Sequence, residues 1–197
     1  KCIGLSLSYE EGKACYIPVQ GFISEDYLGQ KMTEVVKSVK TAAAMYLKES
    51  LAWLEVTEED SALFDTEVAA YLLNPLKDSY QYEEIARDCL GITLPGRNES
   101  LGKISYQEAL ENQQEKALAC IGYLSQIPML AFPVLVERLR EKQMDRLYYE
   151  IEMPTIFALY DMQYRGIRVE REALKEYGEQ LVGRILELEQ SIYCLLY

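Results

Sequence analysis

The chain has 197 residues, with 20 basic and 32 acidic side chains, a formal net charge of −12 and no histidine. Without histidine, a Ser-His or Cys-His nucleophile pair and an imidazole zinc ligand are both excluded. The excess of acids argues against a segment that grips nucleic acid by itself, because that binding relies on Lys and Arg. At 49% hydrophobic and 26% charged, the composition indicates a globular protein of one domain, or of one domain and part of another.

The cysteines favour a cytosolic protein with reduced, mostly buried thiols. Their number is odd and no two form a CxxC pair, so neither a disulfide framework nor a thiolate metal site is predicted. The five are Cys2, Cys15, Cys89, Cys120 and Cys194. The longest apolar run, Ile127 to Val136, is too short to span a bilayer, and we expect a core segment and no membrane partner. No signal peptide is present, and the start at Lys1 suggests a piece of a longer protein.

The first part of the chain predicts strands and then mixed short elements. Residues 2–8 and 14–19 alternate in hydrophobicity around Gly12, which is a hairpin signal. Ser24 is expected to cap a helix that runs to about Val36. The elements expected next are a short strand within 39–44, a helix over 45–53, an apolar run at 62–64 and a helix over 66–73 that Asp65 opens.

The second part predicts helices only. The expected helices cover 82–90, about 105–125, 134–142 and 144–165, with a loop over 93–103. Pro128 and Pro133 are expected to break or kink the chain, Pro154 to interrupt a helix and Gly166 to end it. The last helix is amphipathic, with apolar positions three or four residues apart. These positions are Leu174, Tyr177, Leu181, Ile185, Leu188, Ile192 and Leu195. Strands followed by helices predict an α/β domain of about 145 residues and the start of a helical one.

Two stretches carry a resemblance to a known family. The first is FDTEVAAYLLNP followed by YEEIARDCLG, within residues 64–91. The second covers residues 147–193 and reads LYYEIEMPTIFALYDMQYRGIRVEREALKEYGEQLVGRILELEQSIY. Both resemble bacterial family A DNA polymerases, the DNA polymerase I type. The first resembles a helix pair of the 3′–5′ exonuclease domain, and the second the junction into the polymerase thumb. The hairpin agrees more weakly, while residues 20–60 and 93–125 match poorly.

The resemblance implies a fold and a setting for the chain. Residues 1–146 would form a ribonuclease-H-like exonuclease fold, a mixed sheet flanked by helices, and residues 147–197 would begin the helical thumb. Leu174 to Leu195 would be the first long thumb helix. The parent would be a DNA-directed DNA polymerase of replication and repair, a cytoplasmic, nucleoid-associated transferase. It would use DNA, dNTPs and Mg²⁺ through parts that lie outside these residues.

The same resemblance argues against nuclease chemistry in this segment. An active site of this kind needs converging carboxylates that hold two divalent ions about 4 Å apart. The family pattern has Asp-x-Glu on the first strand, an Asp early in a middle helix and a late Tyr-x-x-x-Asp. The first strand would precede Lys1, the region Ser38–Ala44 contains no acid, and Ile127 stands four residues after Tyr123. We therefore predict no catalytic, cofactor-binding or metal-binding residue here, and an inactive structural domain.

One motif imitates the metal pattern. Asp65-Thr66-Glu67 spells Asp-x-Glu after an apolar run. Acids at this position also satisfy the free N–H groups at a helix start. In the matched family segment these residues begin a helix, and we interpret them as a helix cap.

Other interpretations stay open. One is a truncated but active proofreading exonuclease whose Asp-x-Glu lies upstream of Lys1, and another is an unrelated helical interaction module. The 16 tyrosines invite a base-stacking role, but such platforms come with basic grooves and this chain is acidic. The seam of Leu181, Ile185, Leu188 and Ile192 is a possible self-association surface.

Overall fold

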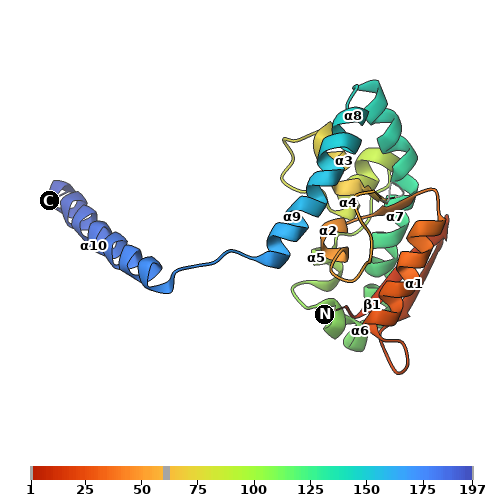
Figure 1. Ribbon diagram of the computed structural model, residues 1–197, viewed down its shortest axis with the longest axis horizontal. Coiled ribbons are helices and arrows are strands. Elements are labelled where there is room, and N and C mark those ends of the chain that lie inside the picture. Colours follow the sequence, from red (N-terminus) through yellow and green to blue (C-terminus); the bar gives the residue numbers. More distant parts are fainter. Residues whose placement is uncertain (1, 60–62, 197) are drawn as a thin grey trace. The chain divides into compact units, whose positions relative to one another are not determined.

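The computed structural model describes residues 2–59 and 63–196. Two residues of stretches discussed above, Asp60 and Ala62, lie outside the described residues. The chain divides into two compact units, residues 1–161 and 162–197, and each is described by itself. The first unit holds the strands and most helices (Figure 1). Its main core gathers side chains from β3 (Ala42–Ala44), β4 (Leu63–Asp65), α3 (Thr66–Leu73), α7 (Gln114–Glu141) and the segment around Tyr148.

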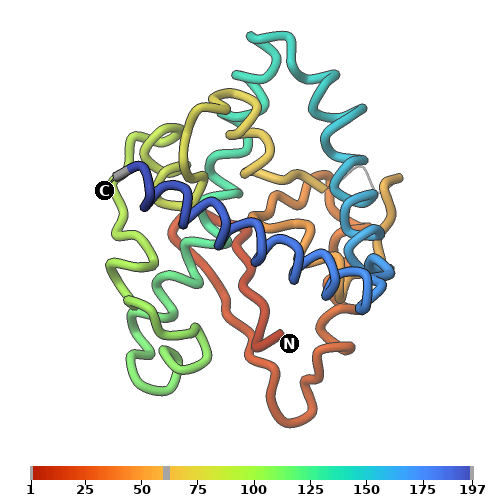
Figure 2. Tube along the Cα trace, turned by 90° about the vertical axis from the view of Figure 1, so that its left-hand side faces the viewer, coloured from red at the N-terminus to blue at the C-terminus, as the bar shows by residue number. Residues whose placement is uncertain are grey.

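The predicted N-terminal hairpin is confirmed. Strands β1 (Gly4–Glu10) and β2 (Lys13–Pro18) pair antiparallel, with Gly4 opposite Pro18. Gly12 in the turn has a φ of 75°, which favours glycine because a Cβ strains this conformation. Helix α7 packs against both strands, and Figure 2 shows the hairpin in red beside this green helix.

The next helix also begins where the sequence predicts. Helix α1 (Glu25–Ser38) is capped by Ser24, whose hydroxyl accepts a hydrogen bond from the Tyr27 N–H at 3.1 Å. Glu25 and Asp26 occupy its first turn, where acids oppose the helix dipole.

A second, very short sheet lies at the centre of the first unit. Strands β3 (Ala42–Ala44) and β4 (Leu63–Asp65) pair in parallel, with Ala44 opposite Asp65. Helix α2 (Leu47–Ser50) is shorter than the helix expected over 45–53, because Tyr46 takes a left-handed conformation with a φ of 55°. Helix α3 (Thr66–Leu73) begins directly after Asp65 and ends at Asn74, as predicted.

The segment expected as a loop over 93–103 contains a helix, and this expectation is wrong. The predicted helix over 82–90 forms as α4 (Tyr82–Ile85) and the π-turn η1 (Ala86–Leu90). Helix α5 (Arg97–Leu101) then interrupts the loop. Leu101 is buried in a small second core with Ala109, Ala117 and Cys120. This long-range burial stabilises a segment whose polar, glycine-containing sequence gives little local helix signal.

The long helical region differs from prediction at two places. Ser105 caps α6 (Tyr106–Asn112) as expected, but the helix breaks at Gln113, whose φ is −142°. Helix α7 (Gln114–Glu141) then runs without interruption through Pro128 and Pro133, which were expected to break or kink the chain. An interior proline costs about 3 kcal/mol. Burial outweighs this cost, since each buried aliphatic side chain contributes about 1.5–3 kcal/mol. The buried side chains of α7 include Ile127, Ala131, Leu135 and Leu139.

In the described part of the chain, α7 is the one helix whose length and composition would allow it to cross a bilayer. The apolar run at 127–136 is thus embedded in a longer helix than the sequence suggested. Its packing against β1, β2, β3 and α3 is typical of a core helix.

After α7 the chain stays helical. Helix α8 (Asp145–Leu147), the π-turn η2 (Tyr148–Glu152) and α9 (Met153–Arg165) follow one another. Pro154 therefore lies in the first turn of α9, where its missing N–H is tolerated. Gly166 ends α9 with a φ of 71°. Residues 166–170 carry no regular structure, and α10 (Arg171–Leu196) is the predicted long helix.

The α/β prediction is confirmed for the secondary-structure content: the first unit combines two small sheets with many helices. The compact unit continues past residue 147 to Asp161, because Tyr148, Met153 and Ile156 belong to its core. The division at 146/147 into exonuclease-like and thumb segments stays a prediction.

Candidate functional site

The Asp-x-Glu motif lies where the two parallel strands end. Asp65 is the last residue of β4 and Thr66 and Glu67 are the first residues of α3. Carboxyl ends of parallel strands are common places for functional groups. The side chain of Asp65 is only 4% exposed.

Main-chain donors occupy both carboxylate oxygens of Asp65. Oδ1 accepts hydrogen bonds from the N–H groups of Glu67 and Val68 at 2.9 and 3.0 Å. Oδ2 accepts one from the Leu47 N–H at 3.1 Å. Burial raises the pKa of Asp65, and these three N–H groups oppose that rise by stabilising the charged form. The interpretation of Asp65 as a helix cap is confirmed.

Glu67 stabilises an unusual backbone conformation. Its Oε2 accepts a hydrogen bond from the N–H of Tyr46 at 3.1 Å. Tyr46 has a positive φ, which costs free energy in a residue other than glycine. Burial, and next the nearby charge of Asp65, raise the pKa of Glu67 to about 7.

A tyrosine from far along the chain completes this network. The hydroxyl of Tyr148 accepts a hydrogen bond from the Asp65 N–H at 2.8 Å and donates one to the Asp65 carbonyl at 3.0 Å. Thr66 Oγ1 donates to the carbonyl of Ala44 at 3.0 Å, which ties α3 to β3. The three side chains of this motif therefore hold β3, β4 and the starts of α2 and α3 together.

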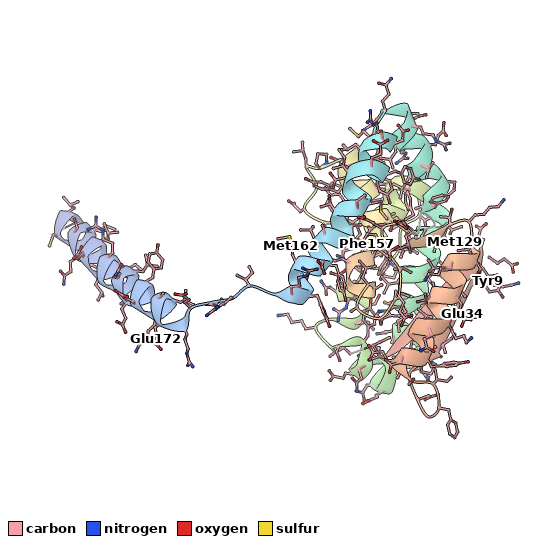
Figure 3. The ribbon with its side chains drawn as sticks, in the orientation of Figure 1. Tyr9, Glu34, Met129, Phe157, Met162 and Glu172 are labelled. Atoms are coloured by element: carbon pink, nitrogen blue, oxygen red, sulfur yellow. The ribbon has the colours of Figure 1, made fainter. Side chains whose placement is uncertain are left out.

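A separate cleft lies along β1 and β3 of the first unit. Its volume is about 660 Å³, and its lining includes every residue from Ile3 to Tyr9 and from Thr41 to Leu47. Helices α1 and α7 supply further apolar side chains, among them Val35 and Met129. Figure 3 labels Met129 and Tyr9, two of the lining residues. No Asp, Glu, Lys or Arg lines the cleft.

The cleft brings together two regions that the sequence analysis compared with the acid-bearing parts of the family pattern. Val39 and residues 41–44 line it from one side, and Leu124 and Ser125, next to Tyr123, line it from α7. Ile127, which stands four residues after Tyr123, is buried in the main core. Neither Asp65 nor Glu67 lines the cleft. Among residues 2–59 and 63–196, no group of three or more His, Cys, Asp or Glu side chains is placed to hold a metal ion.

The contacts of Tyr46 and Tyr148 were not predicted from the sequence. Both depend on long-range proximity, since 83 residues separate Tyr148 from Asp65. The one local signal was the position of Asp65 at a helix start, which identified the cap but not its partners.

Comparison with curated proteins identifies the class: the chain is related to a segment of bacterial family A DNA polymerases. The relatives carry the name DNA polymerase I. The protein of Chloroflexus aurantiacus is 32% identical over 211 residues, which cover 97% of this chain and 21% of the relative. The protein of Borreliella burgdorferi is 26% identical over 212 residues, which cover 98% of this chain and 22% of the relative. The protein of Bacillus subtilis is 30% identical over 151 residues, which cover 73% of this chain and 16% of the relative.

The family resemblance drawn from the motifs is thereby confirmed. The chain spans about a fifth of the length of the relatives from Chloroflexus and Borreliella. None of the protein-family models matches the chain. No solved structure matches it with comparable significance.

Proposed function

We propose that the chain is a structural, exonuclease-like segment of a bacterial DNA polymerase I. Residues 1–146 adopt a ribonuclease-H-like fold without nuclease activity, and residues 147–197 lead into the polymerase thumb. The kinship with DNA polymerase I and the mixed α/β content of the first unit support this assignment. DNA synthesis in replication and repair, with DNA, dNTPs and Mg²⁺, belongs to the rest of the parent protein, in the bacterial cytoplasm at the nucleoid.

One observation carries the inactive assignment: the cleft beside β1 and β3 has no charged lining residue. Two-metal hydrolysis needs hard oxygen ligands, because Mg²⁺ binds carboxylates and water in octahedral geometry. Alanines at positions 42–44 cannot bind a metal ion through their side chains.

The Asp65-Thr66-Glu67 motif is a poor substitute for such a site. Both oxygens of Asp65 already accept main-chain hydrogen bonds. A metal ion there would have to displace donors that cap α3 and position α2. The motif thus supports a structural role, in which the first unit is a platform for neighbouring parts of the polymerase.

Incubating the purified chain with a 3′-labelled single-stranded DNA and Mg²⁺ or Mn²⁺ tests the proposal. We expect no release of label, while a proofreading DNA polymerase I serves as the positive control. Release that requires the metal and stops on chelation would instead establish the active proofreading exonuclease. Asp65→Asn keeps the size of the side chain, and loss of that activity in this variant would locate it at the motif.

A further inference from the structure

A second, smaller pocket lies on the first unit where α3, α4 and η1 meet the C-terminal half of α7. We call it the α3–α7 pocket. Its volume is about 350 Å³, near the lower end of the range of about 300–1,000 Å³ that is usual for small-molecule sites. Among the described residues, it shares no lining residue with the cleft beside β1 and β3. Its size suits a small molecule better than a length of polypeptide or nucleic acid.

Two cationic side chains at the end of α7 line this pocket and contact neutral acceptors. The Lys142 N–H donates to the Arg138 carbonyl at 3.1 Å, so the two residues lie one helical turn apart on the same face. The Arg138 guanidinium donates to Cys89 Sγ at 3.9 Å, and the Lys142 ammonium donates to the Leu73 carbonyl at 2.9 Å. These contacts use one of the five donors of the guanidinium and one of the three donors of the ammonium.

The two acids that line the pocket have cationic partners of their own. The Lys77 ammonium pairs with the carboxylates of Glu84, at 3.7 Å, and of Asp88. The Arg87 guanidinium lies 3.6 Å from each of these carboxylates. With three cations and two acids, the lining has a net charge of +1, although the whole chain carries −12. The charges of the two α7 cations are therefore available to an anion in the pocket.

Phosphate is the anion that these groups suit best. A phosphate monoester carries about −1.5 to −2 charges at pH 7 and three strong acceptor oxygens, whereas a carboxylate carries one charge. The planar guanidinium of Arg138 can bind two oxygens of one phosphate group at once, and the Lys142 ammonium adds a point charge beside it. Leu73, Ile85 and Leu135 also line the pocket, and these apolar side chains suit a short carbon chain.

We propose that the α3–α7 pocket binds a small phosphate monoester. Its phosphate group lies between Arg138 and Lys142, and its carbon chain contacts Leu73, Ile85 and Leu135. The inference goes beyond the proposed structural role and does not depend on it, because the pocket lies apart from the cleft beside β1 and β3. It also differs from a grip on DNA, whose backbone phosphates are diesters with a single charge.

Isothermal titration calorimetry of the full chain in a low-salt buffer without phosphate tests the proposal with three probes. We expect propyl phosphate to bind at one site per chain, about tenfold more tightly than inorganic phosphate, because its carbons bury apolar surface. Butyrate has a similar carbon chain and one charge, and it should bind at least about fivefold more weakly than propyl phosphate. Equal affinities for butyrate and propyl phosphate, or no binding of propyl phosphate at millimolar concentration, would overturn the proposal.

A single-stranded thymidine oligonucleotide distinguishes the two sources of phosphate. Its internal phosphates are diesters, and it should not compete with propyl phosphate. Competition at a comparable concentration of phosphate groups would assign the pocket to a nucleic-acid backbone and overturn the proposal.

Charge variants check the location. Arg138→Gln and Lys142→Gln should each weaken propyl phosphate about tenfold or more, because each removes a charged donor. Arg140→Gln is the matched control, an exposed cation of the same helix that does not line the pocket, and it should leave the affinity unchanged. Asp88→Asn removes an acid from the lining and should strengthen binding about threefold. Circular dichroism confirms that each variant is folded, and Lys142 and Asp88 are exposed enough for their variants to fold if Arg138→Gln does not. An equal loss in Arg140→Gln, or none in Lys142→Gln, would contradict the assigned site.

Discussion

Asp65 is the only buried acidic residue in the described part of the chain. Three N–H groups from two helices converge on its carboxylate, and the Tyr148 hydroxyl bonds its main chain on both sides. A buried carboxylate is tolerated when donors of this kind satisfy it. Its role is to fix the junction of α2, β4 and α3.

Asp65→Ala should therefore lower the free energy of unfolding by about 2–4 kcal/mol, since three buried N–H groups lose their acceptor. Urea denaturation followed by circular dichroism measures the change. Asp26→Ala is the matched control, an exposed acid in the first turn of α1, and should cost less than about 1 kcal/mol. Equal losses in the two variants would contradict the role of Asp65.

Glu67 predicts a pH dependence of stability. The pKa of Glu67 is about 7 in the folded chain, above the ordinary glutamate value of 4.5, so the folded state binds more protons between these two pH values. Its contribution to stability is present below about pH 4.5 and is lost as the pH rises through about 7. Allowing for solvent screening, the loss is about 1–2 kcal/mol.

Measuring the free energy of unfolding at pH 5 and pH 8 tests this pH dependence. Glu67→Gln keeps an acceptor for the Tyr46 N–H and should flatten the difference between the two pH values. Glu34→Gln is the control, because Glu34 is an exposed partner of Lys31. A slope that persists unchanged in Glu67→Gln would locate the titrating group elsewhere.

At the scale of elements, α7 organises the first unit. It packs against both strands of the hairpin, β3, α3 and α6, and contains two prolines. Pro128 is fully buried, whereas Pro133 is exposed. Packing therefore offsets part of the destabilisation caused by Pro128, but not that caused by Pro133.

Pro133→Ala should raise the free energy of unfolding by about 1–2 kcal/mol, because alanine restores a donor to the helix. Greater freedom of the unfolded chain offsets part of the gain. Pro128→Ala, the comparison variant, should gain less or lose stability, since it also removes buried atoms. Thermal unfolding followed by circular dichroism at 222 nm, where helices have a strong negative ellipticity, ranks the stabilities of the parent chain and the two variants. A larger gain for Pro128→Ala would contradict the packing argument.

Local signals predicted the elements that local chemistry determines. Gly12 marked the hairpin turn, and Ser24, Asp65 and Ser105 marked helix starts, because turns and caps depend on neighbouring residues. The elements that local signals did not predict correctly depend on packing between residues far apart in the sequence. The burial of Leu101 stabilises α5, and the core around α7 overrides its prolines. The sequence showed that acids are missing where the family pattern has them. It did not predict the cleft, because β1, β3 and α7, which enclose it, are far apart in the sequence.

At the scale of the whole molecule, the first unit holds the core within residues 1–161. The last helix is amphipathic and belongs to the second unit, residues 162–197. We expect a chain that ends at Asp161 to unfold at the same temperature as the full chain, within a few degrees. Sedimentation should show concentration-dependent association only for the full chain, through the seam of Leu181, Ile185, Leu188 and Ile192. A large drop in melting temperature on truncation would show that α10 supports the core.

The bond between Tyr148 and Asp65 also has a kinetic consequence. It joins residues 83 positions apart, a contact of high sequence separation. Closing so long a loop is entropically costly, and contacts of this kind slow folding. A nascent chain adds its residues in order, and β4 leaves the ribosome long before Tyr148 is made. Until then the Asp65 backbone lacks this partner, so the first unit can complete its packing only after synthesis has passed Tyr148.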